Sequence, residues 1–469
     1  MSWLFPTGNQ INLQLGWPSP SLFPVDALKQ GADAVLSDSD AATAALIYGP
    51  NPGAPALRKE LARWLGTAYH HDPAAIDVAR ISVTAGASQT LANILLRFAD
   101  PSYTRHVWMV EPTYFLACPV FEDCGFAGKL RGVPEDDEGI DLVFLRAALE
   151  AAEQAVSGAQ GSQNGAEDRP KAKPASYEKI YKHIIYCVPT FANPSGKTMS
   201  LGHRRALVRL AMEFDALIVS DDVYDLLYWP ASRERERERD GDLVLPPRLV
   251  DINRQLDPNS KWGNTVSNGS FSKIVAPGTR TSWIEATPAF ATWLANTGAT
   301  WSGGNPAHLV SSMVERLLSS GRLEAHIRDV LIPTYCARYF CMIDAIDAHL
   351  APLGVRIDKG TPYMTSAWGD ASKTEDIELA GGFFLCITLP TTEGYPRTSE
   401  LATAAIARKE LKFAHGKMFE VKGDAGSKAR SDAGYGSTVR LCWAFHDEAT
   451  IEEGIRRLRD VLVESRVSA

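Results

Sequence analysis

The sequence predicts an α/β protein with a large domain, built on a mainly parallel, mixed sheet, and a smaller α+β domain. Short apolar runs alternate with helix-like patterns through most of the chain. Such alternation is typical of parallel strands covered by helices on both faces. The pattern of apolar and polar residues changes near residue 330. A length of 469 residues suits two or three domains of roughly 150 residues each.

The predicted strands of the large domain are short and end in polar or turn-forming residues. Strands are expected at 81–83, 107–110, 184–188 and 216–220. Apolar spacing predicts a helix over 56–66, which Gly66 would end, and another that begins near Ser88.

The smaller domain mixes both kinds of element. We expect helices at 338–350, 399–411 and 451–462, strands at 381–389 and 438–444, and a surface loop over the polar stretch 420–435.

The domain boundaries follow from the same patterns. Residues 48–330 are expected to form the large domain, and residues 1–47 with 331–469 the small one. Segments 151–176, poor in large apolar residues, and 233–240, a run of alternating charge, are interpreted as surface insertions.

The amino-acid composition limits the classes of function that the chain is expected to have. Hydrophobic residues make up 45% and charged residues 22% of the chain, and the net charge is −8. This is typical of a soluble globular protein and disfavours nucleic-acid and membrane-surface partners. No apolar run approaches the ~18 residues of a membrane span. The chain shows no HExxH motif and no Cys/His cluster, so no metal site is expected.

The cysteines and the start of the sequence indicate a compartment. Seven scattered cysteines without a CxxC pair suit reduced thiols. The opening MSWLFPTGNQ has no basic segment followed by an apolar run, so we expect no signal peptide and a cytoplasmic location.

The most informative segment is Ser267–Ile284, which reads SNGSFSKIVAPGTRTSWI. The amine of Lys273 can form a Schiff base with an aldehyde. Ser270, Ser272 and Arg280 are the groups that a phosphate dianion needs nearby. Together they indicate pyridoxal 5′-phosphate, although a solvated loop lysine explains the segment equally well by itself.

A second segment, Ser82–Leu91, contains a strand, a turn at Gly86 and a helix start. Backbone N–H groups at a helix N-terminus bind anions, and Ser88 and Gln89 could add donors. Taken alone, an ordinary helix cap at Ser88 is the more common explanation.

Two further segments follow predicted strands. Asp221 or Asp222 could face a pyridine nitrogen and keep it protonated, since opposite charge favours the charged form. Asn193 precedes Pro194, which holds it extended, so its amide can point into a crevice. A helix cap and an Asn-Pro turn are the simpler interpretations of these segments.

The order of the segments is more specific than any one of them. Gly-Ala-Ser-Gln, Glu-Pro-Thr-Tyr, Asn-Pro-Ser-Gly, Asp-Asp-Val-Tyr and Ser-Phe-Ser-Lys with a following Arg occur in that order. In this the sequence resembles the class I/II aminotransferases of pyridoxal-phosphate fold type I. The branch it resembles most contains the 2-aminoadipate, kynurenine, aromatic and valine–pyruvate aminotransferases. The resemblance runs from Leu15 to Arg440.

The resemblance implies roles around the cofactor ring. Lys273 would hold the cofactor and move the proton during catalysis. Asp221 would pair with the ring nitrogen, and Tyr224 and Asn193 with the ring oxygen. Tyr114 would stack on the ring. The implied catalytic residues are therefore Lys273, Asp221 and Tyr224.

The same resemblance implies a phosphate site and a substrate site. The phosphate would be held by Ala87, Ser88, Gln89, Ser270, Ser272, Arg280 and Tyr48. Arg440 would clamp the substrate α-carboxylate through two parallel hydrogen bonds, with Asn193 and Gly16 bordering it.

A homodimer with shared active sites is also implied. Tyr48 resembles a tyrosine that reaches the phosphate from the neighbouring subunit, and the loop 302–305 resembles another element of this kind. One departure is Ser282, where the family often has glycine.

The implied activity is transfer of an amino group from an L-α-amino acid to a 2-oxo acid through Schiff-base and quinonoid intermediates. An enzyme of the same fold that catalyses elimination, γ-substitution or cyclisation is the alternative. A cofactor-binding regulator is a further hypothesis. Ser270 and Lys273 also match S-x-x-K of penicillin-binding serine enzymes, but its partners S-D-N and K-T-G are absent.

The sequence does not identify the amino donor. Trp17, Trp301 and Tyr335 are candidates for the pocket wall, although core packing is the more common role of such residues.

Overall fold

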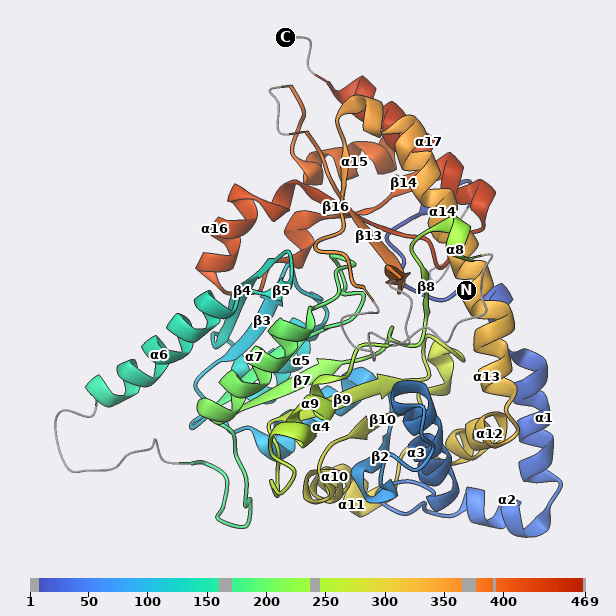
Figure 1. The fold of residues 1–469 in the computed structure, drawn as a ribbon, viewed down its shortest axis with the longest axis vertical. Coiled ribbons are helices and arrows are strands. Elements are labelled where there is room, and N and C mark those ends of the chain that lie inside the picture. The colour runs from blue at the N-terminus through green and yellow to red at the C-terminus, as the bar shows by residue number, and fades with distance from the viewer. Residues whose placement is uncertain (1–7, 160–170, 237–244, 365–376, 391–393, 467–469) are drawn as a thin grey trace.

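The computed structural model describes residues 8–159, 171–236, 245–364, 377–390 and 394–466. A large central sheet with helices on both faces forms one part of the molecule, and a smaller antiparallel sheet with long helices lies beyond its edge (Figure 1). The predicted combination of a mainly parallel, mixed sheet with a smaller α+β part is confirmed.

The central sheet has eight strands in the order β2-β10-β9-β7-β6-β3-β4-β5. Strand β10 runs antiparallel to both of its neighbours, and β5 runs antiparallel to β4, whereas the other pairs are parallel. The strands are β2 (Ile81–Thr84), β3 (Val107–Glu111), β4 (Leu130–Asp136), β5 (Gly139–Ile140), β6 (His183–Cys187), β7 (Ala216–Asp221), β9 (Thr265–Ser270) and β10 (Ser282–Glu285).

Side-chain alternation along each strand fills two separate cores. On β3, Val107 and Met109 pack into one core and Trp108 into the other. Because successive side chains of a strand point to opposite faces, an apolar run of this kind needs helices on both sides. The helices α4 (Ala87–Phe98), α5 (Ala117–Phe121) and α10 (Pro288–Ala295) cover the first face, and α6 (Leu142–Ala159), α7 (Leu201–Glu213) and α9 (Leu249–Leu256) the second.

The smaller sheet has the order β11-β13-β16-β15 and is antiparallel throughout. Two short parallel strands, β1 and β14, and a pair formed by β8 and β12 complete the strands. These strands are β1 (Ile11–Asn12), β8 (Tyr228–Pro230), β11 (Arg356–Asp358), β12 (Leu379–Gly381), β13 (Phe384–Thr388), β14 (Leu411–Lys412), β15 (Ala414–His415) and β16 (Thr438–Cys442).

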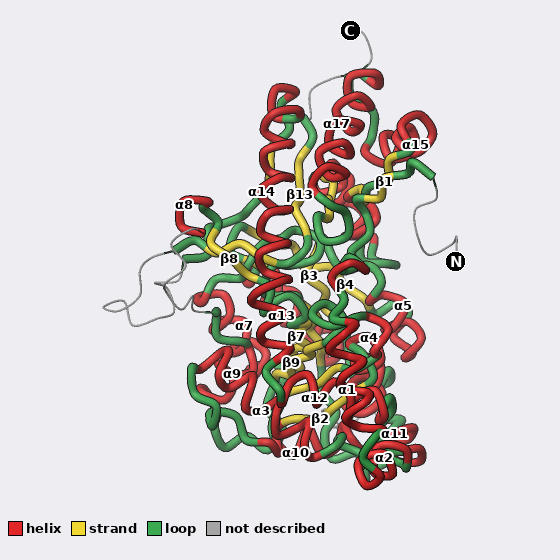
Figure 2. The backbone as a smooth tube through the Cα atoms, turned by 90° about the vertical axis from the view of Figure 1, so that its right-hand side faces the viewer, coloured by secondary structure: helices red, strands yellow, loops and turns green. Residues whose placement is uncertain are grey.

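Helices pack against this smaller sheet and join it to the large one. Helix α14 packs against α17, and the preceding helix α13 lies nearer the large sheet (Figure 2). The remaining helices are α1 (Val25–Leu36), α2 (Ser39–Leu46), α3 (Pro55–His70), α8 (Arg233–Glu236), α11 (Gly298–Gly303), α12 (His308–Ser319), α13 (Arg322–His326), α14 (Ile332–His349), α15 (Thr398–Lys409), α16 (Ala425–Ala433) and α17 (Glu448–Ser465).

The N-terminal segment contributes to both parts. Strand β1 pairs with β14 beside the smaller sheet, whereas helix α1 packs against α12. Figure 1 shows α1 and α2 beside α12 and α3, at the end of the molecule away from β13 and β16. The division of the chain into 48–330 and 1–47 with 331–469 stays a prediction.

Two sequence predictions about elements were wrong. Helix α3 does not end at Gly66 but runs to His70, and His71 follows in the left-handed conformation, with φ 52°. Gly66 instead lets the chain return closely, because a Cβ there would lie 2.5 Å from the carbonyl oxygen of Asp72. The stretch 420–435 is not merely a surface loop, since it contains helix α16, which packs against β4.

The two proposed insertions are described only in part. Residues 151–159 belong to helix α6, and residues 233–236 form the short helix α8. The rest of 233–240 and residues 160–170 lie outside the described residues.

Candidate active site

Most of the predicted site residues surround one cavity of about 360 Å³. The cavity lies where the carboxyl ends of the parallel strands meet the smaller sheet, a usual position for ligand sites in α/β proteins. The predicted residues that line it are Gly16, Ala87, Ser88, Tyr114, Asn193, Asp221, Tyr224, Ser270, Ser272, Lys273, Arg280 and Arg440.

Lys273 follows β9 and reaches the centre of this group. Its Nζ donates a hydrogen bond to the carbonyl oxygen of Gly16, at 2.8 Å. It also lies 5.8 Å from the centre of the Tyr224 ring. Burial, with the nearby charge of Arg440, lowers the pKa of Lys273 to about 8. About a tenth of this amine is therefore uncharged at pH 7, far more than of an ordinary lysine, and the uncharged form is the one that a nucleophile or proton carrier requires.

Asp221 ends β7 and faces the cavity, whereas Asp222 points away from it. The hydroxyl of Tyr186 donates to Asp221 at 2.8 Å, and the amide of Asn268 at 3.5 Å. Burial raises the pKa of Asp221 to about 6. Asp222 instead accepts hydrogen bonds from Ser220 and Ser267. The carboxylate available to a cationic ligand in the cavity is therefore that of Asp221.

The opposite end of the cavity is built to hold an anion. Helix α4 begins at Ala87, directly after β2 and the turn at Gly86, and its N-terminus faces the cavity. Backbone N–H groups at such an end attract negative charge. Ser270 donates to Ser272 at 2.9 Å, and the guanidinium of Arg280 lies 3.5 Å from the Ser272 hydroxyl. These donors suit a phosphate group.

Gly86 permits this arrangement. Its φ is 100°, and a Cβ there would lie 1.7 Å from Nη2 of Arg280. Any other residue would therefore strain the backbone and displace the guanidinium.

Ser282, the departure from the family pattern, is part of the same turn. Its hydroxyl accepts the Gly86 N–H at 2.7 Å and lies 2.6 Å from the hydroxyl of Thr84. The hydroxyl of Thr90 donates to Thr84 at 2.7 Å. This buried chain of hydroxyl groups joins β10, β2 and α4, so Ser282 helps fix the start of α4.

Arg440 extends from β16 toward the opposite wall of the cavity. Its guanidinium donates to Oδ1 of Asn193 at 2.7 Å and to the carbonyl oxygen of Gln14 at 2.5 Å. It also lies 4.2 Å from the centre of the Phe384 ring. Its Nε is buried without a partner among the described residues. A substrate carboxylate would satisfy this donor.

Gly16 brings the N-terminal segment close to this wall. A Cβ at Gly16 would lie 2.7 Å from the Phe384 ring. The absence of a side chain therefore lets the Gly16 carbonyl approach Lys273.

The aromatic residues Tyr224 and Tyr114 also line the cavity. Burial raises the pKa of Tyr224 well above its ordinary value and that of Tyr114 to about 12. Both hydroxyls therefore stay protonated at neutral pH and can donate a hydrogen bond. Tyr224 packs against Phe384, with ring centres 5.7 Å apart.

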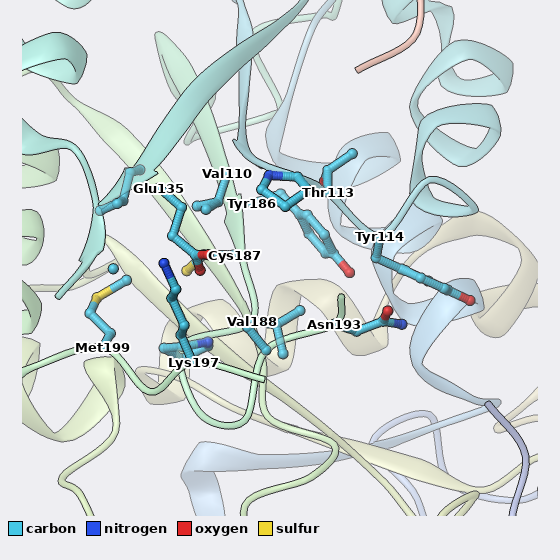
Figure 3. A pocket seen from close by; sticks show the side chains of 15 residues that line it. Val110, Thr113, Tyr114, Glu135, Tyr186, Cys187, Val188, Asn193, Lys197 and Met199 are labelled. Atoms are coloured by element: carbon cyan, nitrogen blue, oxygen red, sulfur yellow. The ribbon is translucent and has the colours of Figure 1, made fainter. Parts of the chain in front are cut away.

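A second, smaller cavity adjoins the first behind Asn193. Figure 3 shows Tyr114 and Asn193 at one side of it and Glu135 and Lys197 at the other. Ser195 donates to Glu135 at 3.0 Å, so the loop that carries Asn193 is tied to β4. Burial raises the pKa of Glu135 to about 7, which the charge of Lys197 opposes.

Two predicted residues lie outside the main cavity. The amide of Gln89 bonds to Asn93, at 3.3 Å, on the exposed side of α4. Tyr48 is 84% exposed. It lies beside the predicted cross-subunit loop, since a Cβ at Gly304 would be 3.3 Å from Tyr48 Cβ. The structure of a single chain thus brings together the two segments that the sequence associates with a neighbouring subunit.

The sequence analysis missed several residues of the site. Tyr186, Asn268, Gln14, Phe384 and Lys412 were not singled out. Asn268 could have been found, because it stands two residues before Ser270 on the same strand and therefore on the same face. Tyr186 lies on the predicted strand 184–188 and Gln14 directly precedes Leu15, but neither belongs to a motif. Phe384 and Lys412 come from segments distant in sequence and needed the folded structure.

The aromatic candidates for the pocket wall have different places. Trp17 lines the cavity and is 39% exposed, contrary to the expectation of core packing. Tyr335 is fully buried in the core, and Trp301 is 67% exposed on α11.

Within the described ranges, no group of three or more His, Cys, Asp and Glu residues could hold a metal ion. None of the described helices combines the length and the apolar character that crossing a membrane requires.

Comparison with known proteins identifies the family. The family model "Aminotransferase class I and II" matches residues 9–458. The uncharacterized protein YER152C of Saccharomyces cerevisiae is 33% identical, over 95% of each chain. Aromatic-amino-acid aminotransferase 1 of Thermococcus litoralis is 29% identical, over 98% of this chain and 90% of that protein.

A solved structure supports the same conclusion. The kynurenine aminotransferase of Pyrococcus horikoshii, crystallised in complex with PMP, superposes with a TM-score of 0.71. It is 26% identical, over 99% of this chain and 93% of that chain. The matches include proteins named for aromatic amino acids, 2-aminoadipate and kynurenine, as the sequence predicted. The protein therefore belongs to the class I and II aminotransferases and is an enzyme that transfers amino groups.

Proposed function

We propose that the protein binds pyridoxal 5′-phosphate in the cavity and transfers the amino group of an L-α-amino acid to a 2-oxo acid. The observation that carries the proposal is the convergence of Lys273, Asp221 and Arg440 on one cavity. An amine, a carboxylate and a guanidinium with an unpartnered Nε are the groups that this reaction needs.

The residues fit the cofactor at both of its ends. Asp221 accepts hydrogen bonds from the neutral donors Tyr186 and Asn268, so a protonated pyridine nitrogen would add a cationic partner directly at this carboxylate. The N-terminus of α4, Ser272 and Arg280 would hold the phosphate. A cavity of about 360 Å³ is within the usual range for a cofactor with a small substrate.

The bound cofactor supplies an aldehyde that takes up the amino group and a ring that delocalises the electron pair released at the substrate Cα. Lys273 would hold the cofactor in the resting enzyme. During turnover its amine, with a pKa lowered to about 8, would remove the Cα proton and return it to the cofactor carbon. Asp221 would keep the ring nitrogen protonated.

Arg440 and its neighbours orient the substrate. The guanidinium is fixed by Asn193 and the Gln14 carbonyl, so its direction is set before a substrate arrives. A carboxylate bound there places the adjoining Cα toward Lys273, and this preorganisation contributes to catalysis. Tyr224 and Asn193 would donate to the ring oxygen, and Tyr114 would stack on the ring.

We also propose that the enzyme works as a homodimer in the cytoplasm. Tyr48 and Gly304 lie together on an exposed surface, where the adjacent Leu46 and Ile47 are 65% and 62% exposed. Exposed apolar surface of this kind favours association. Tyr48 would reach the phosphate of the partner subunit. All seven cysteines are free thiols, which suits a reducing compartment.

The proposal is tested by the absorbance of the purified holoenzyme during titration with a panel of L-amino acids. We expect particular donors to convert the bound cofactor to pyridoxamine phosphate. The Lys273→Ala variant, reconstituted with cofactor, should convert it about 100-fold more slowly or worse, because its proton carrier is missing.

A control variant separates the chemistry from folding. Lys59 is exposed on α3 and distant from the cavity residues in sequence, so Lys59→Ala should behave as the unmodified enzyme. Product formation without pyridoxamine phosphate would instead indicate elimination, substitution or cyclisation. No spectral change with any donor would refute amino-group transfer.

A further inference from the structure

Lys412 contributes a positive charge to the cavity that neither the cofactor nor the α-carboxylate needs. It lies on β14, which pairs in parallel with β1, and Asn12 is its direct neighbour. Lys412, Asn12 and Gln14 all line the cavity. Leu13 lies between Asn12 and Gln14, and Leu411 precedes Lys412. Both leucines are fully buried on the opposite side of these strands. Strand alternation therefore directs Lys412 to the cavity.

The other cations of the cavity already have assigned partners. Arg280 lies at the phosphate end, with Ser272. Lys273 donates to the Gly16 carbonyl, and Arg440 is held by Asn193 and the Gln14 carbonyl. In the part of the chain that the structure describes, Lys412 Nζ has neither a hydrogen bond nor a carboxylate within ion-pair distance.

The Cα atoms of Lys412 and Arg440 are close enough for one small molecule to contact both side chains. Ala414 lies two residues after Lys412 and is the direct neighbour of Arg440 on β16. Two residues of extended chain span roughly 6–7 Å, and paired strands lie about 5 Å apart. The two Cα atoms are thus roughly 8 Å apart, and both side chains face the same cavity. A molecule with one carboxylate on each cation would lie between them.

Apolar side chains also line the cavity. They include Trp17, Phe115 and Leu116, together with Phe384, which stacks on Arg440. Methylene groups between two carboxylates would pack there. Asp221 is the one acidic side chain of the cavity lining within the described residues, and it would pair with the nitrogen of the cofactor ring. Nothing acidic therefore competes for Lys412.

We propose that Lys412 binds the distal carboxylate of a dicarboxylic amino or 2-oxo acid, while Arg440 binds its α-carboxylate. The inference rests on the proposed function for the role of Arg440. It makes Lys412 a specificity-determining residue that distinguishes dicarboxylic from monocarboxylic substrates.

The test measures binding of a diacid that cannot react. Glutarate and its monocarboxylic counterpart pentanoate are titrated into holoenzyme by isothermal calorimetry. For Lys412→Met, which keeps the length of the side chain but removes its charge, we expect the preference for glutarate over pentanoate to fall about 10- to 100-fold. Lys412→Arg should keep most of the preference.

Controls separate charge from structure. Lys59→Met makes the same substitution at an exposed site on α3 and should leave the preference intact. The thermal midpoint of each variant checks that it is folded. An unchanged preference in Lys412→Met would overturn the proposal, and so would an equal loss of affinity for glutarate and pentanoate.

A kinetic measurement distinguishes this inference from the function on which it rests. In transfer assays, Lys412→Met should raise the KM for 2-oxoglutarate relative to that for 4-methyl-2-oxopentanoate. Glutarate binding that depends on Lys412, in an enzyme that transfers no amino group, would refute the proposed function but support the diacid site. Transfer to 2-oxoglutarate that is insensitive to Lys412 would do the reverse.

Discussion

Lys273 has the two properties that a proton carrier beside a substrate carbon requires, namely a fixed position and a lowered pKa. The position comes from the hydrogen bond to the Gly16 carbonyl. The pKa of about 8 comes from burial and from the charge of Arg440. Arg440 thus lowers the pKa of the Lys273 amine and would also bind the substrate carboxylate.

The pKa of Lys273 predicts how cofactor-free protein captures pyridoxal phosphate. Only the uncharged amine attacks the aldehyde, so the capture rate should rise with pH and level off above about 8. An ordinary lysine would level off above about 10.4. Arg440→Gln should move the midpoint upward, because a neighbouring cation is removed. The measurement is stopped-flow absorbance across pH, and a midpoint near 10 in the unmodified protein would contradict the prediction.

Asp221 predicts a pH dependence of stability in the cofactor-free protein. Its pKa rises from 3.8 in the unfolded chain to about 6 in the folded protein, so the folded state holds its proton more tightly. The stability associated with this group is present below pH 4 and is lost as the pH rises through about 6.

Asp221→Asn should therefore gain stability relative to the unmodified protein as the pH rises from 4.5 to 7, by about 2 kcal/mol. Thermal midpoints of both proteins across this range measure the difference. Because Asp222 and Asp225 titrate in both proteins, their effects largely cancel. A difference that does not change with pH would count against a raised pKa at Asp221.

At the scale of elements, the turn between β2 and α4 would determine where the proposed phosphate site lies. The glycine at position 86 permits a positive φ and the approach of Arg280. The Ser282 hydroxyl on β10 then satisfies the Gly86 N–H. A residue that departs from the family pattern thus stabilises the turn that precedes α4.

Ser282→Ala tests this role. The substitution leaves the buried Gly86 N–H without its acceptor, which costs roughly 1–3 kcal/mol. We expect a lower thermal midpoint and weaker binding of pyridoxal phosphate by the cofactor-free protein. Ser319→Ala, at an exposed position of α12, is the matched control and should change neither. Unaltered cofactor affinity in Ser282→Ala would show that the turn does not depend on this hydroxyl.

Periodicity predicted the regular elements well, because burial on both faces leaves a clear apolar run. The strands ending at Thr84 and Asp221 were placed within a residue or two of their observed ends. Long-range contacts were harder to predict. Gly66 was predicted to end a helix, whereas it accommodates the returning backbone at Asp72. Helix α16 was missed because its sequence, AGSKARSDA, has no apolar periodicity. Its Arg430 pairs with the distant Glu111, a contact that only the folded structure shows.

Some residues of the candidate site could likewise be predicted from the sequence, and others could not. Residues that follow strand ends, such as Lys273 and Asp221, could be predicted because parallel strands bring their carboxyl ends together. Gln14, Phe384 and Lys412 could not, since they reach the cavity from strands and loops of the smaller part. Tyr48 and Gly304 could be linked only through the resemblance, and their proximity within one chain is a property of the folded structure.

At the scale of the whole molecule, the proposed dimer would use the exposed surface around Tyr48. Tyr48 itself lies outside the cavity lining of its own chain. In a dimer with shared sites, each active site would combine Lys273 of one subunit with Tyr48 of the other. Closed two-fold symmetry is the commonest way to make such an interface.

Subunit mixing tests this arrangement. Lys273→Ala is expected to be inactive, and Tyr48→Ala to bind the cofactor weakly. After the two are unfolded and refolded together in equal amounts, half of the dimers should be hybrids with one intact site. Activity at low cofactor concentration should then recover to about a quarter of that of the unmodified enzyme. Hybrid dimers without recovered activity would contradict shared sites.

The direct test of the assigned function is to follow the nitrogen atom. The holoenzyme is incubated with a ¹⁵N-labelled L-amino acid and an unlabelled 2-oxo acid, and the products are analysed by mass spectrometry. We predict that ¹⁵N appears in the amino acid derived from the 2-oxo acid, and that Lys273→Ala abolishes this transfer. Release of the label as ammonia, or its retention in the donor carbon skeleton, would contradict amino-group transfer by this enzyme.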